Sequence, residues 1–408
     1  MKVVAIITEF NPFHKGHKYI IEKAKALTNS DYCIIITSGN YVQRGEPAFV
    51  DKYTKTEIAL LNGADLVIEL PTAFSTASAM YFGKCAVSIL DSLNIVDYLA
   101  FGIEADNLCS FEKIVDILID EPPLYKNNLK KNLALGFSFP AARKKALSEV
   151  FPNTSLDFLD KPNSILGIEY LKALKELNSS IKPIGIKRIN ADYHQSFSND
   201  DTNENRLFSA SNIRAVKDSQ LANLLADISP IYSENLFATF PLSLNNSFSA
   251  IAGLSILKAA ASQNNYFDVP DYLFDKIKGN IGNYVNYSDF ILSLKSKDIS
   301  YTAISRALLH ITLNITQQLI FDMLENNYGN YIRILGVKAG SEVLLKELSV
   351  HCEKALLTNV KDYKKLLSEK SIEFFEHSLA CEDIYRLCQT IDLKKPQPNE
   401  FQQKFIRI

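Results

Sequence analysis

The chain of 408 residues lacks the features that mark membrane-bound, exported or redox-active proteins. No apolar run reaches the roughly eighteen residues that a transmembrane helix needs, so we expect a soluble protein with no membrane partner. The first residues form no basic region followed by an apolar stretch, which argues against an export signal and favours the cytoplasm. The cysteines form no CxxC pair and lie mostly in apolar patterns, as is typical of reduced, buried thiols.

Net charge is nearly absent as well, at −2 from 44 basic and 46 acidic side chains. Electrostatics of the whole chain therefore give no sign of a nucleic-acid-binding protein, and contact with RNA would need a local basic patch. A stretch with a helical pattern, from residue 124 to about 159, carries the densest positive cluster of the N-terminal half: Lys130, Lys131, Arg143, Lys144 and Lys145. This cluster fits either a solvated helix face or a surface that contacts an RNA backbone.

The N-terminus is the most informative stretch of the sequence. A run of β-branched residues breaks at Asn11-Pro12, and a helical pattern begins at about Lys18. The pattern predicts a buried strand, a tight loop and the start of a helix. Such a junction presents free backbone N–H groups and the positive end of a helix dipole, which suit a phosphate.

Two histidines flank a glycine in this loop, at a spacing that places both imidazoles on one side of a helical turn. Gly16 lets a ligand approach the backbone, so His14 and His17 could share one polyphosphate. The strand before and the helix after favour a nucleotide site over a polar loop in which the histidines cap the helix. Zinc is the weaker alternative, because no cysteine or third histidine follows at a ligand spacing, and we expect no metal held by protein side chains.

Further apolar runs alternate with helical patterns along the first half of the chain. The expected strands are 32–37, 65–70, 96–102 and 182–189, and the expected helices between them are 18–27, 53–61, 78–93, 111–120 and 168–177. This alternation predicts a parallel sheet with a ligand crevice at the carboxyl ends of its strands. The polar ends should therefore gather at one edge: residues 9–17, 38–44, Glu69, 102–104, and the cations Lys187 and Arg188, which suit phosphate.

From residue 215 onward helical patterns dominate, interrupted by a short strand-like run at 331–336. We therefore expect an α/β fold with two domains. Residues 1–215 should form a Rossmann-like catalytic domain with a helical insertion at about 122–160, and residues 216–408 a mainly α-helical domain. Arg306 and His310, four apart on one expected helix, fit a surface arginine beside a part-buried histidine better than an RNA contact. The polar stretch 190–205 is expected to be a loop and could act as a lid.

A second candidate motif spans Phe208 to Arg214, where hydroxyl groups precede a helix and an arginine follows one turn on. The hydroxyl groups belong to Ser209 and Ser211. Serine is a common helix cap, so by itself this stretch is only weak evidence of a functional site.

These motifs carry a family resemblance. A strand followed by His14-Lys15-Gly16-His17 resembles the His-x-Gly-His signature of the nucleotidylyltransferase superfamily, and the longer string 9–17 is similar to the start of the bacterial tRNA(Met) cytidine acetate ligases. Residues 208–214 resemble the second superfamily motif, Ile-Ser-Ser-x-x-x-Arg, with Phe208 and Ala210 in place of the isoleucine and one serine. The similarity extends through 38–40, 43–47, 69–71, 101–104, 139–140, 162–167 and 333–336.

The resemblance implies that ATP is a substrate, with Mg²⁺ on its phosphates, and that His14, His17 and Arg214 act in catalysis. Asn163 is implied as an ATP contact, although it could simply cap the following helix. Together with the strand-end cations, the expected ATP contacts are Ile7, Thr8, Glu9, Phe10, Asn11, Pro12, Phe13, His14, Lys15, Gly16, His17, Lys18, Tyr19, Ile20, Gly102, Asn163, Lys187, Arg188, Ser209, Ser211 and Arg214.

Spacing alone does not separate adenylyl transfer to a phosphate from activation of a carboxylate. The resemblance implies the second reaction: acetate and ATP form acetyl-adenylate, and the acetyl group passes to the exocyclic amine of the wobble cytidine of elongator tRNA(Met), which gives N4-acetylcytidine. The domain of residues 216–408 is then the expected tRNA-binding part. One alternative is a small-molecule adenylyltransferase, which the long helical extension disfavours. The other is an RNA-binding scaffold with a degenerate nucleotide site, which the intact motif disfavours.

Overall fold

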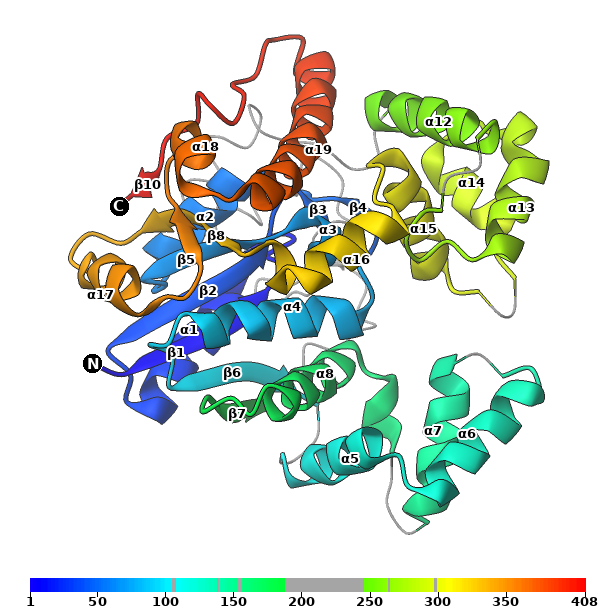
Figure 1. The fold of residues 1–408 in the computed structure, drawn as a ribbon, viewed down its shortest axis with the longest axis horizontal. Helices are drawn as coiled ribbons and strands as arrows, with labels where there is room; N and C mark the ends of the chain where they lie inside the picture. The colour runs from blue at the N-terminus through cyan, green and yellow to red at the C-terminus, as the bar shows by residue number, and fades with distance from the viewer. Residues whose placement is uncertain (105–107, 138, 153–155, 188–245, 263–264, 297–298) are drawn as a thin grey trace, which may run out of the picture.

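The computed structural model describes residues 1–104, 108–137, 139–152, 156–187, 246–262, 265–296 and 299–408. Within these residues a mixed sheet of eight strands forms the centre of the molecule, in the order β10-β8-β5-β2-β1-β6-β7 with β9 beside β8 (Figure 1). Its strands are β1 (Val3–Thr8), β2 (Tyr32–Ser38), β5 (Leu66–Leu70), β6 (Tyr98–Ile103), β7 (Lys182–Lys187), β8 (Tyr331–Val337), β9 (Ala355–Leu357) and β10 (Ile406–Arg407). A small separate hairpin joins β3 (Tyr41–Val42) to β4 (Glu46–Pro47).

Strands β1, β2, β5, β6 and β7 run parallel, as the alternating pattern predicts. Their side chains enter two apolar cores on opposite faces of the sheet: Val3, Ala5 and Ile7 of β1 face one core, and Val4 and Ile6 face the other. This arrangement explains why the strands are continuous apolar runs. The register aligns Thr8 with Thr37, which brings the carboxyl ends of β1 and β2 together.

Helices cover both faces of the sheet. The core that contains Val4 and Ile6 is completed by α1 (Lys15–Thr28) and α2 (Lys52–Leu61). The core that contains Val3 is completed by several helices, among them α4 (Ala79–Ser92), α5 (Cys109–Asp120) and α8 (Pro162–Glu176). Each of these helices lies where the sequence pattern predicts one, although α8 begins six residues earlier than the expected residue 168.

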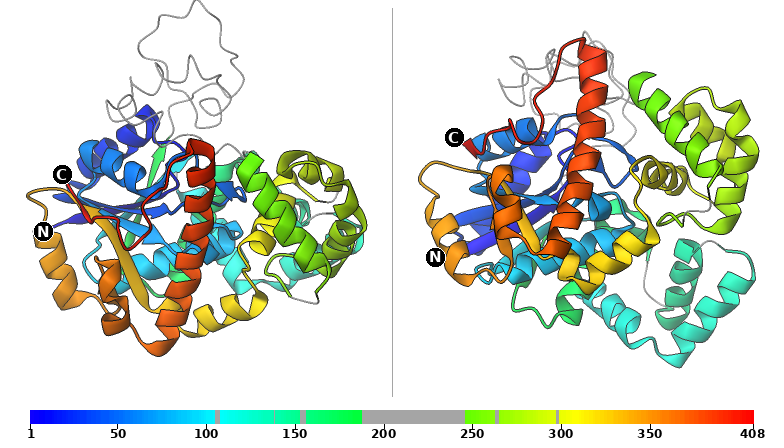
Figure 2. Two further views of the ribbon diagram at one scale, coloured as in Figure 1. Left: turned by 90° about the horizontal axis from the view of Figure 1, so that it is seen from above. Right: turned by 45° about the horizontal axis from the view of Figure 1, so that its top comes forward.

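Two groups of helices form lobes beside the sheet. Figure 1 shows α6 (Pro123–Ala134) and α7 (Phe139–Val150) in one lobe, and Figure 2 shows the other lobe from two further directions. The second lobe holds α12 (Asn246–Ala260), α13 (Asp271–Asn280), α14 (Tyr287–Leu294) and α15 (Tyr301–Thr312). The helical pattern expected at 124–159 is divided near Gly136, whose φ of 83° lies in the left-handed region that ends a helix readily.

The remaining helices are short, except for the last. They are α3 (Thr72–Ser75), α16 (Gln317–Glu325), α17 (Val343–His351), α18 (Tyr363–Leu366) and α19 (Glu369–Leu393). None of the helices in the described part of the chain is both long and apolar enough to cross a membrane. None of the six cysteines, all of which lie in the described residues, forms a disulfide. Cys33, Cys85, Cys381 and Cys388 are buried as expected, whereas Cys109 is exposed.

The C-terminal half is mainly helical, as expected, but it is not separate from the sheet. Strand β8 pairs antiparallel with β5, and β9 and β10 both pair with β8. All seven residues of β8 are buried, because the strand covers what would otherwise be an open edge of the sheet. The expected boundary near residue 215 lies outside the described residues, and a division there would cut one sheet in two.

A buried charge cluster ties these C-terminal segments to the sheet. Lys52, at the start of α2, is only 1 % exposed. Its ammonium nitrogen lies 2.9 Å from Glu69 Oε1 of β5, 3.4 Å from Glu382 Oε2 of α19 and 3.2 Å from Glu400 Oε2 of the C-terminal tail. Burial raises the pKa of Glu382 to about 8, an effect that Lys52 opposes and the carboxylates of Glu400 and Glu69 reinforce. The acidic side chains of the cluster therefore depend on the ammonium group of Lys52 for their counter-charge.

We predict that Lys52→Met lowers the free energy of unfolding by about 3–5 kcal/mol, because it leaves buried carboxylates without a counter-charge. Urea denaturation measures the change. Adding Glu382→Gln to Lys52→Met should recover part of the loss, since the neutral amide cannot ionise beside the remaining carboxylates of Glu69 and Glu400. The matched control is Lys84→Met, which breaks an ion pair to Glu176 on the surface and should cost less than about 1 kcal/mol. Equal losses for Lys52→Met and Lys84→Met would contradict the role of the cluster.

Candidate active site

The loop between β1 and α1 is packed into the protein rather than lying on its surface. Phe10 and Phe13 are buried and their rings pack at a centroid distance of 4.8 Å. Asn11, in a cis peptide with Pro12, is also buried, and its Oδ1 accepts a hydrogen bond of 2.6 Å from the backbone N–H of Phe49. Two buried aromatic rings thus lie on either side of Asn11 in the loop, and the buried amide of Asn11 has a hydrogen-bond partner.

A buried lysine of α2 also fixes this loop. Lys55 is fully buried in α2, and its ammonium group donates to three backbone carbonyls: Glu9 at 3.2 Å, Ser38 at 2.8 Å and Gly39 at 2.7 Å. These carbonyls lie at or directly after the ends of β1 and β2, so one side chain joins the two strand ends. Burial lowers the pKa of Lys55 to about 8, so near neutral pH the ammonium keeps its charge and its three hydrogens.

The two histidines of the loop form a reciprocal cap on α1. Nδ1 of His14 accepts from the N–H of Gly16 at 3.1 Å, and Nδ1 of His17 accepts from the N–H of His14 at 3.2 Å. The hydrogen-bond network thereby assigns the neutral tautomer in which Nε2 carries the hydrogen. Because Nδ1 of each ring is an acceptor, each neutral imidazole can donate a hydrogen bond only through Nε2–H.

Ring contacts fix the orientation of both imidazoles. The His14 and His17 rings stack at 3.8 Å with an interplanar angle of 23°, and Phe10 packs edge-on against His17 at 4.9 Å. A Cβ atom at Gly16 would lie 2.9 Å from Cε1 of His14. The glycine therefore makes room for the imidazole of His14, in addition to any role in admitting a ligand.

This geometry corrects one expectation from the sequence. The junction was expected to present free backbone N–H groups, but Gly16 N–H donates to Nδ1 of His14, and His17 N–H donates to the His14 carbonyl at 2.8 Å. Capping and ligand binding are not alternatives here, because they use different nitrogens of the same rings. In this conformation the imidazoles, more than the amides, supply hydrogen-bond donors to an anion.

The ends of β6 and β7 and the start of α8 lie on one flank of this loop. Lys187 aligns with Ile103 at the end of the β6–β7 ladder, and Gly102 lies one residue earlier. Burial raises the pKa of Tyr170 in α8, and the Glu9 carboxylate adds to that shift, so this carboxylate acts on α8 as well. Lys187 and the ends of β6 and β7 therefore reach the same edge of the sheet, whereas Arg188 lies outside the described residues.

Asn163 does not cap a helix as one interpretation of the sequence suggested. Helix α8 already begins at Pro162, and Asn163 Nδ2 donates to Glu104 Oε1 at 2.6 Å while Ser164 Oγ donates to Glu104 Oε2 at 2.7 Å. Glu104 thus fixes the first turn of α8 against the end of β6.

Several other predicted contacts are placed more simply. Lys18 is exposed and lies 4.0 Å from Glu22, whereas Tyr19 and Ile20 pack against the apolar core beneath α1. The carboxylate of Glu69 forms an ion pair with Lys52 in the buried charge cluster. The stretch 190–205 and four predicted phosphate ligands lie outside the described residues: Arg188, Ser209, Ser211 and Arg214.

The two lysines of α2 were not predicted as functional from the sequence. Lys52 and Lys55 are three residues apart on a helix whose buried face also carries Thr56, Ile58 and Ala59. Lysines on the buried face of a helix signal buried ammonium groups, because such a face normally excludes them. That signal was present, but the partners come from distant parts of the chain.

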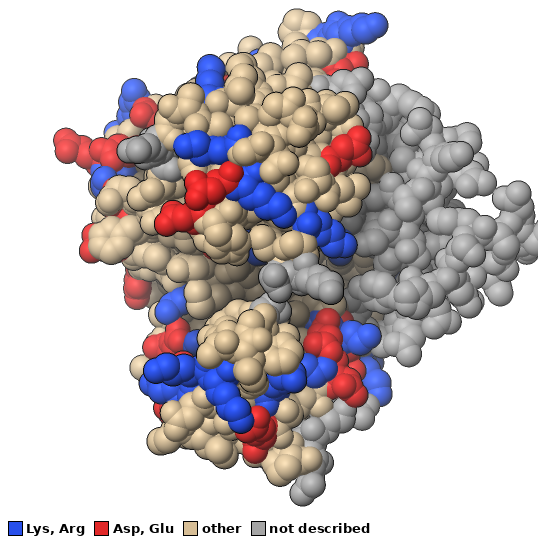
Figure 3. Space-filling model, turned by 90° about the vertical axis from the view of Figure 1, so that its right-hand side faces the viewer, with Lys and Arg blue, Asp and Glu red and all other residues tan. Residues whose placement is uncertain are grey.

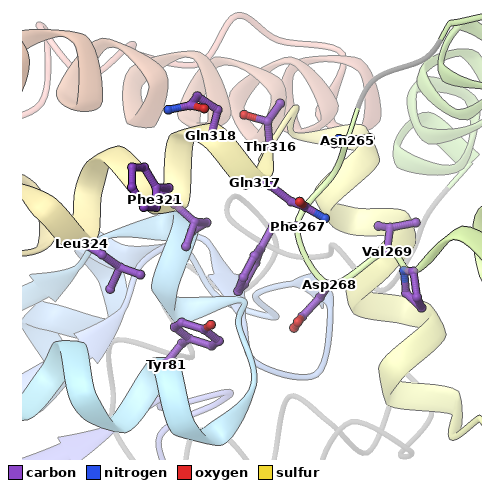
Figure 4. Close-up of a pocket in the computed structure, with 12 residues that line it drawn as sticks. Tyr81, Asn265, Phe267, Asp268, Val269, Thr316, Gln317, Gln318, Phe321 and Leu324 are labelled. Atoms are coloured by element: carbon purple, nitrogen blue, oxygen red, sulfur yellow. The ribbon is translucent and has the colours of Figure 1, made fainter.

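A separate cavity of about 970 Å³ lies between α4, residues 265–270 and α16, with Tyr81, Phe267 and Asp268 on one side and Phe321 and Leu324 on α16 (Figure 4). None of the predicted ATP contacts that the structure describes lines it. Beside it His310 is fully buried, with Nδ1 2.7 Å from the Phe267 carbonyl, so this histidine is not even part-exposed as expected and cannot contact RNA. Arg306 lies 3.8 Å from Asp268, a loose ion pair.

The arrangement at the strand ends suits a polyphosphate. Two imidazole N–H groups are held side by side, and Lys187 adds a positive charge from β7. Among the described residues, no three His, Cys, Asp or Glu side chains are grouped in a way that could hold a metal ion. The described residues offer an anion hydrogen-bond donors and a cationic side chain.

Comparison with known proteins shows the family to which the chain belongs. A family model described as HIGH Nucleotidyl Transferase matches residues 1–400. A tRNA(Met) cytidine acetate ligase of Clostridium perfringens is 39% identical over 400 residues, which cover 94% of this chain and 95% of the relative. The chain belongs to the HIGH nucleotidyltransferase family and, within it, to the family of the tRNA(Met) cytidine acetate ligases.

Further relatives agree with this family assignment. The ligase of Caldanaerobacter subterraneus is 39% identical over 394 residues, with 95% of both chains covered. The crystal structure of Thermotoga maritima TmcAL bound with alpha-thio ATP has a TM-score of 0.87 at 25% identity, and its apo form has a TM-score of 0.89 at 27% identity. Both cover 100% of either chain. The family and the α/β nucleotidylyltransferase fold expected from the sequence are thus confirmed.

We predict that Lys55→Met loosens the loop that carries the histidines. Amide hydrogen exchange in peptides spanning residues 8–17 and 38–45 should accelerate about tenfold or more, because hydrogen bonds to charged donors contribute about 1.5–3 kcal/mol each.

The control for Lys55→Met is Lys25→Met, which removes an ammonium group 2.8 Å from Asp65 at the opposite end of the strands. It should leave exchange in these peptides nearly unchanged. If both variants accelerated exchange equally, or if neither did, Lys55 would not be the group that holds the strand ends.

Proposed function

We propose that the protein is an ATP-dependent ligase that acetylates the wobble cytidine of elongator tRNA(Met) in the cytoplasm. The observation that carries the proposal is the histidine cap: two imidazoles whose Nδ1 atoms hold the start of α1 and whose Nε2–H edges can bind a triphosphate. Support comes from the relatives named tRNA(Met) cytidine acetate ligase and from the neighbour whose crystal structure contains alpha-thio ATP.

In the first step a carboxylate oxygen of acetate attacks the α-phosphorus of ATP, and pyrophosphate leaves. The protein's task is to align the two substrates and to neutralise the charge that builds up on the phosphates. His14 and His17 donate through Nε2–H, and Lys187 adds charge from the end of β7. The predicted ligands Arg188, Ser209, Ser211 and Arg214 belong to the same proposal.

Magnesium is proposed to accompany ATP, because Mg²⁺ bound to ATP commonly takes most of its ligands from phosphates and water. When bound, the ion would neutralise phosphate charge, in addition to the donors that His14, His17 and Lys187 supply.

In the second step the exocyclic amine of cytidine attacks the acetyl carbon, AMP leaves, and the nitrogen loses a proton. A mixed anhydride is reactive enough to acylate this weak nucleophile, so no covalent enzyme intermediate is needed. The remaining requirement is a surface that brings the RNA to the crevice.

The lobe formed by α6 and α7 supplies cations for an RNA backbone. Figure 3 shows Lys and Arg side chains gathered on this lower lobe. Of the five basic residues identified in the sequence, Arg143 pairs with Glu169 and Lys144 with Asp160, whereas Lys130, Lys131 and Lys145 are exposed and have no carboxylate partner among the described residues. Lys145 lies 4.1 Å from the ring centre of Phe137.

These three lysines and the exposed ring of Phe137 combine charge with a surface for stacking, as RNA-binding surfaces do. We assign the α6–α7 lobe to tRNA binding, and the helices of residues 246–312 to a second contact surface on the same RNA.

The reaction itself is tested by incubating the protein with ATP and labelled acetate, and then adding tRNA(Met). We predict label in acetyl-adenylate first and in N4-acetylcytidine afterwards. Adenylyl transfer to another acceptor, with the label remaining in acetate, would instead identify a small-molecule adenylyltransferase. Binding of tRNA without ATP turnover would identify a scaffold.

The role of the Nε2 edge is tested by comparing His17→Asn with His17→Ala. Asparagine can keep the acceptor that caps the helix but has no Nε2–H, so we predict a near-normal unfolding midpoint for His17→Asn and a loss of about 1 kcal/mol for His17→Ala. Both variants should reduce kcat/KM for acetyl-adenylate formation by about 100-fold or more. An active His17→Asn enzyme would show that the imidazole serves only as a cap.

A further inference from the structure

The β3–β4 hairpin directly follows β2, so it lies at the carboxyl edge of the sheet, where ligands bind in this class of fold. Its turn comprises Gln43, Arg44 and Gly45 and is closed by a hydrogen bond of 2.9 Å from Gly45 N–H to the Val42 carbonyl.

The backbone of this turn is fixed from two sides. On one side Gln43 N–H donates to Glu9 Oε1 at 2.6 Å, which joins the turn to the loop that carries the histidines. On the other side the Gly45 carbonyl accepts from Ser305 Oγ at 2.8 Å and from Tyr287 OH at 3.2 Å, which joins it to α15 and α14. Gly45 has a φ of 81°, and a Cβ there would overlap the backbone of Arg306.

Arg44 lies between these two anchored residues, and its own side chain is exposed. In the part of the chain that the structure describes, this side chain makes no hydrogen bond and no ion pair. A solvated arginine on a surface normally sits on a mobile backbone, whereas this one sits on a turn that is held by the catalytic loop and by the helical lobe together. The turn therefore presents a guanidinium group at a defined place beside the site.

Sheet order indicates which substrate this group faces. The residues assigned to ATP are carried by the β1–α1 loop, β6, α8 and β7, all on one side of β1 or on β1 itself, whereas β2 and its hairpin lie on the other side. Acetate must approach the α-phosphorus opposite the leaving pyrophosphate, and the RNA amine then attacks the acetyl carbon. We assign the RNA to the β2 side of β1, because the described residues assigned to ATP lie on β1 itself or on its other side. Acetate is small and suits an enclosed position, but an exposed guanidinium suits the backbone of a large RNA.

We propose that Arg44 binds a phosphate of the RNA backbone next to the cytidine that is acetylated, and so positions that nucleotide over the acetyl-adenylate. This inference rests on the proposed function, because it assumes that the acceptor is RNA. It assigns the β3–β4 hairpin to recognition of the second substrate.

The test compares Arg44→Ala, Arg44→Lys and the control Arg407→Ala. Arg407 is an exposed arginine on β10, which pairs with β8 near Val337 and so lies by the start of β5, away from the strand ends. For Arg44→Ala we expect acetyl-adenylate formation without RNA to stay within about twofold of the wild type. The KM for tRNA should rise about tenfold, and the slope of log affinity against log salt should become shallower by about one.

Arg44→Lys should retain most of the salt dependence, and Arg407→Ala should match the wild type. A sharper readout uses anticodon stem-loop RNAs in which a phosphate flanking the cytidine is replaced by a neutral methylphosphonate. One such replacement should weaken wild-type binding to the level of Arg44→Ala and should not weaken Arg44→Ala further.

Loss of acetyl-adenylate formation in Arg44→Ala would overturn the inference, because the guanidinium would then serve ATP or acetate. Unchanged tRNA affinity, or an effect seen with whole tRNA but not with the stem-loop, would overturn it too. Failure of the wild-type enzyme to activate acetate would instead refute the proposed function, and the salt dependence of RNA binding would still decide the role of Arg44.

Discussion

Two buried ammonium groups, one turn apart on α2, set the geometry on which the rest of the structure depends. Lys55 donates to three carbonyls at the ends of β1 and β2, and Lys52 is surrounded by carboxylates from β5, α19 and the C-terminal tail. Burying an ammonium group is costly unless every partner is in place. The strand ends that shape the site and the C-terminal segments that close the sheet are therefore stabilised together.

This constraint explains why the histidine loop is rigid. The loop is fixed by apolar anchors, by Lys55 and by Nδ1 of each imidazole, so the loop itself does not have to be ordered when an anion binds. In the neutral tautomer the hydrogen on Nε2 makes that nitrogen the donor of each ring. Preorganised donors of this kind stabilise developing charge without further reorganisation.

Sequence patterns predicted those parts of the structure that depend on interactions between residues close together in the chain. Strand and helix periodicity predicted the parallel sheet and its covering helices, and the His14-x-Gly16-His17 spacing predicts a nucleotide site in the loop that the structure places between β1 and α1. Pairings between distant residues were not predictable in this way. The run at 331–336 was predicted to be a strand, but nothing in it indicates that β5 is its neighbour. The spacing of Lys55 and Glu104 in the sequence does not reveal their partners either. The free amides expected at the start of α1 were wrong because the imidazoles that mark the motif also occupy those amides.

The central claim is that the capped imidazoles grip the triphosphate through Nε2. A crystal structure of the protein with a non-hydrolysable ATP analogue tests it most directly. The account predicts phosphate oxygens about 2.7–3.2 Å from Nε2 of His14 and His17, with both Nδ1 atoms still accepting from the backbone. Phosphates bound elsewhere, or histidines swung away so that the backbone amides alone hold the anion, would contradict it.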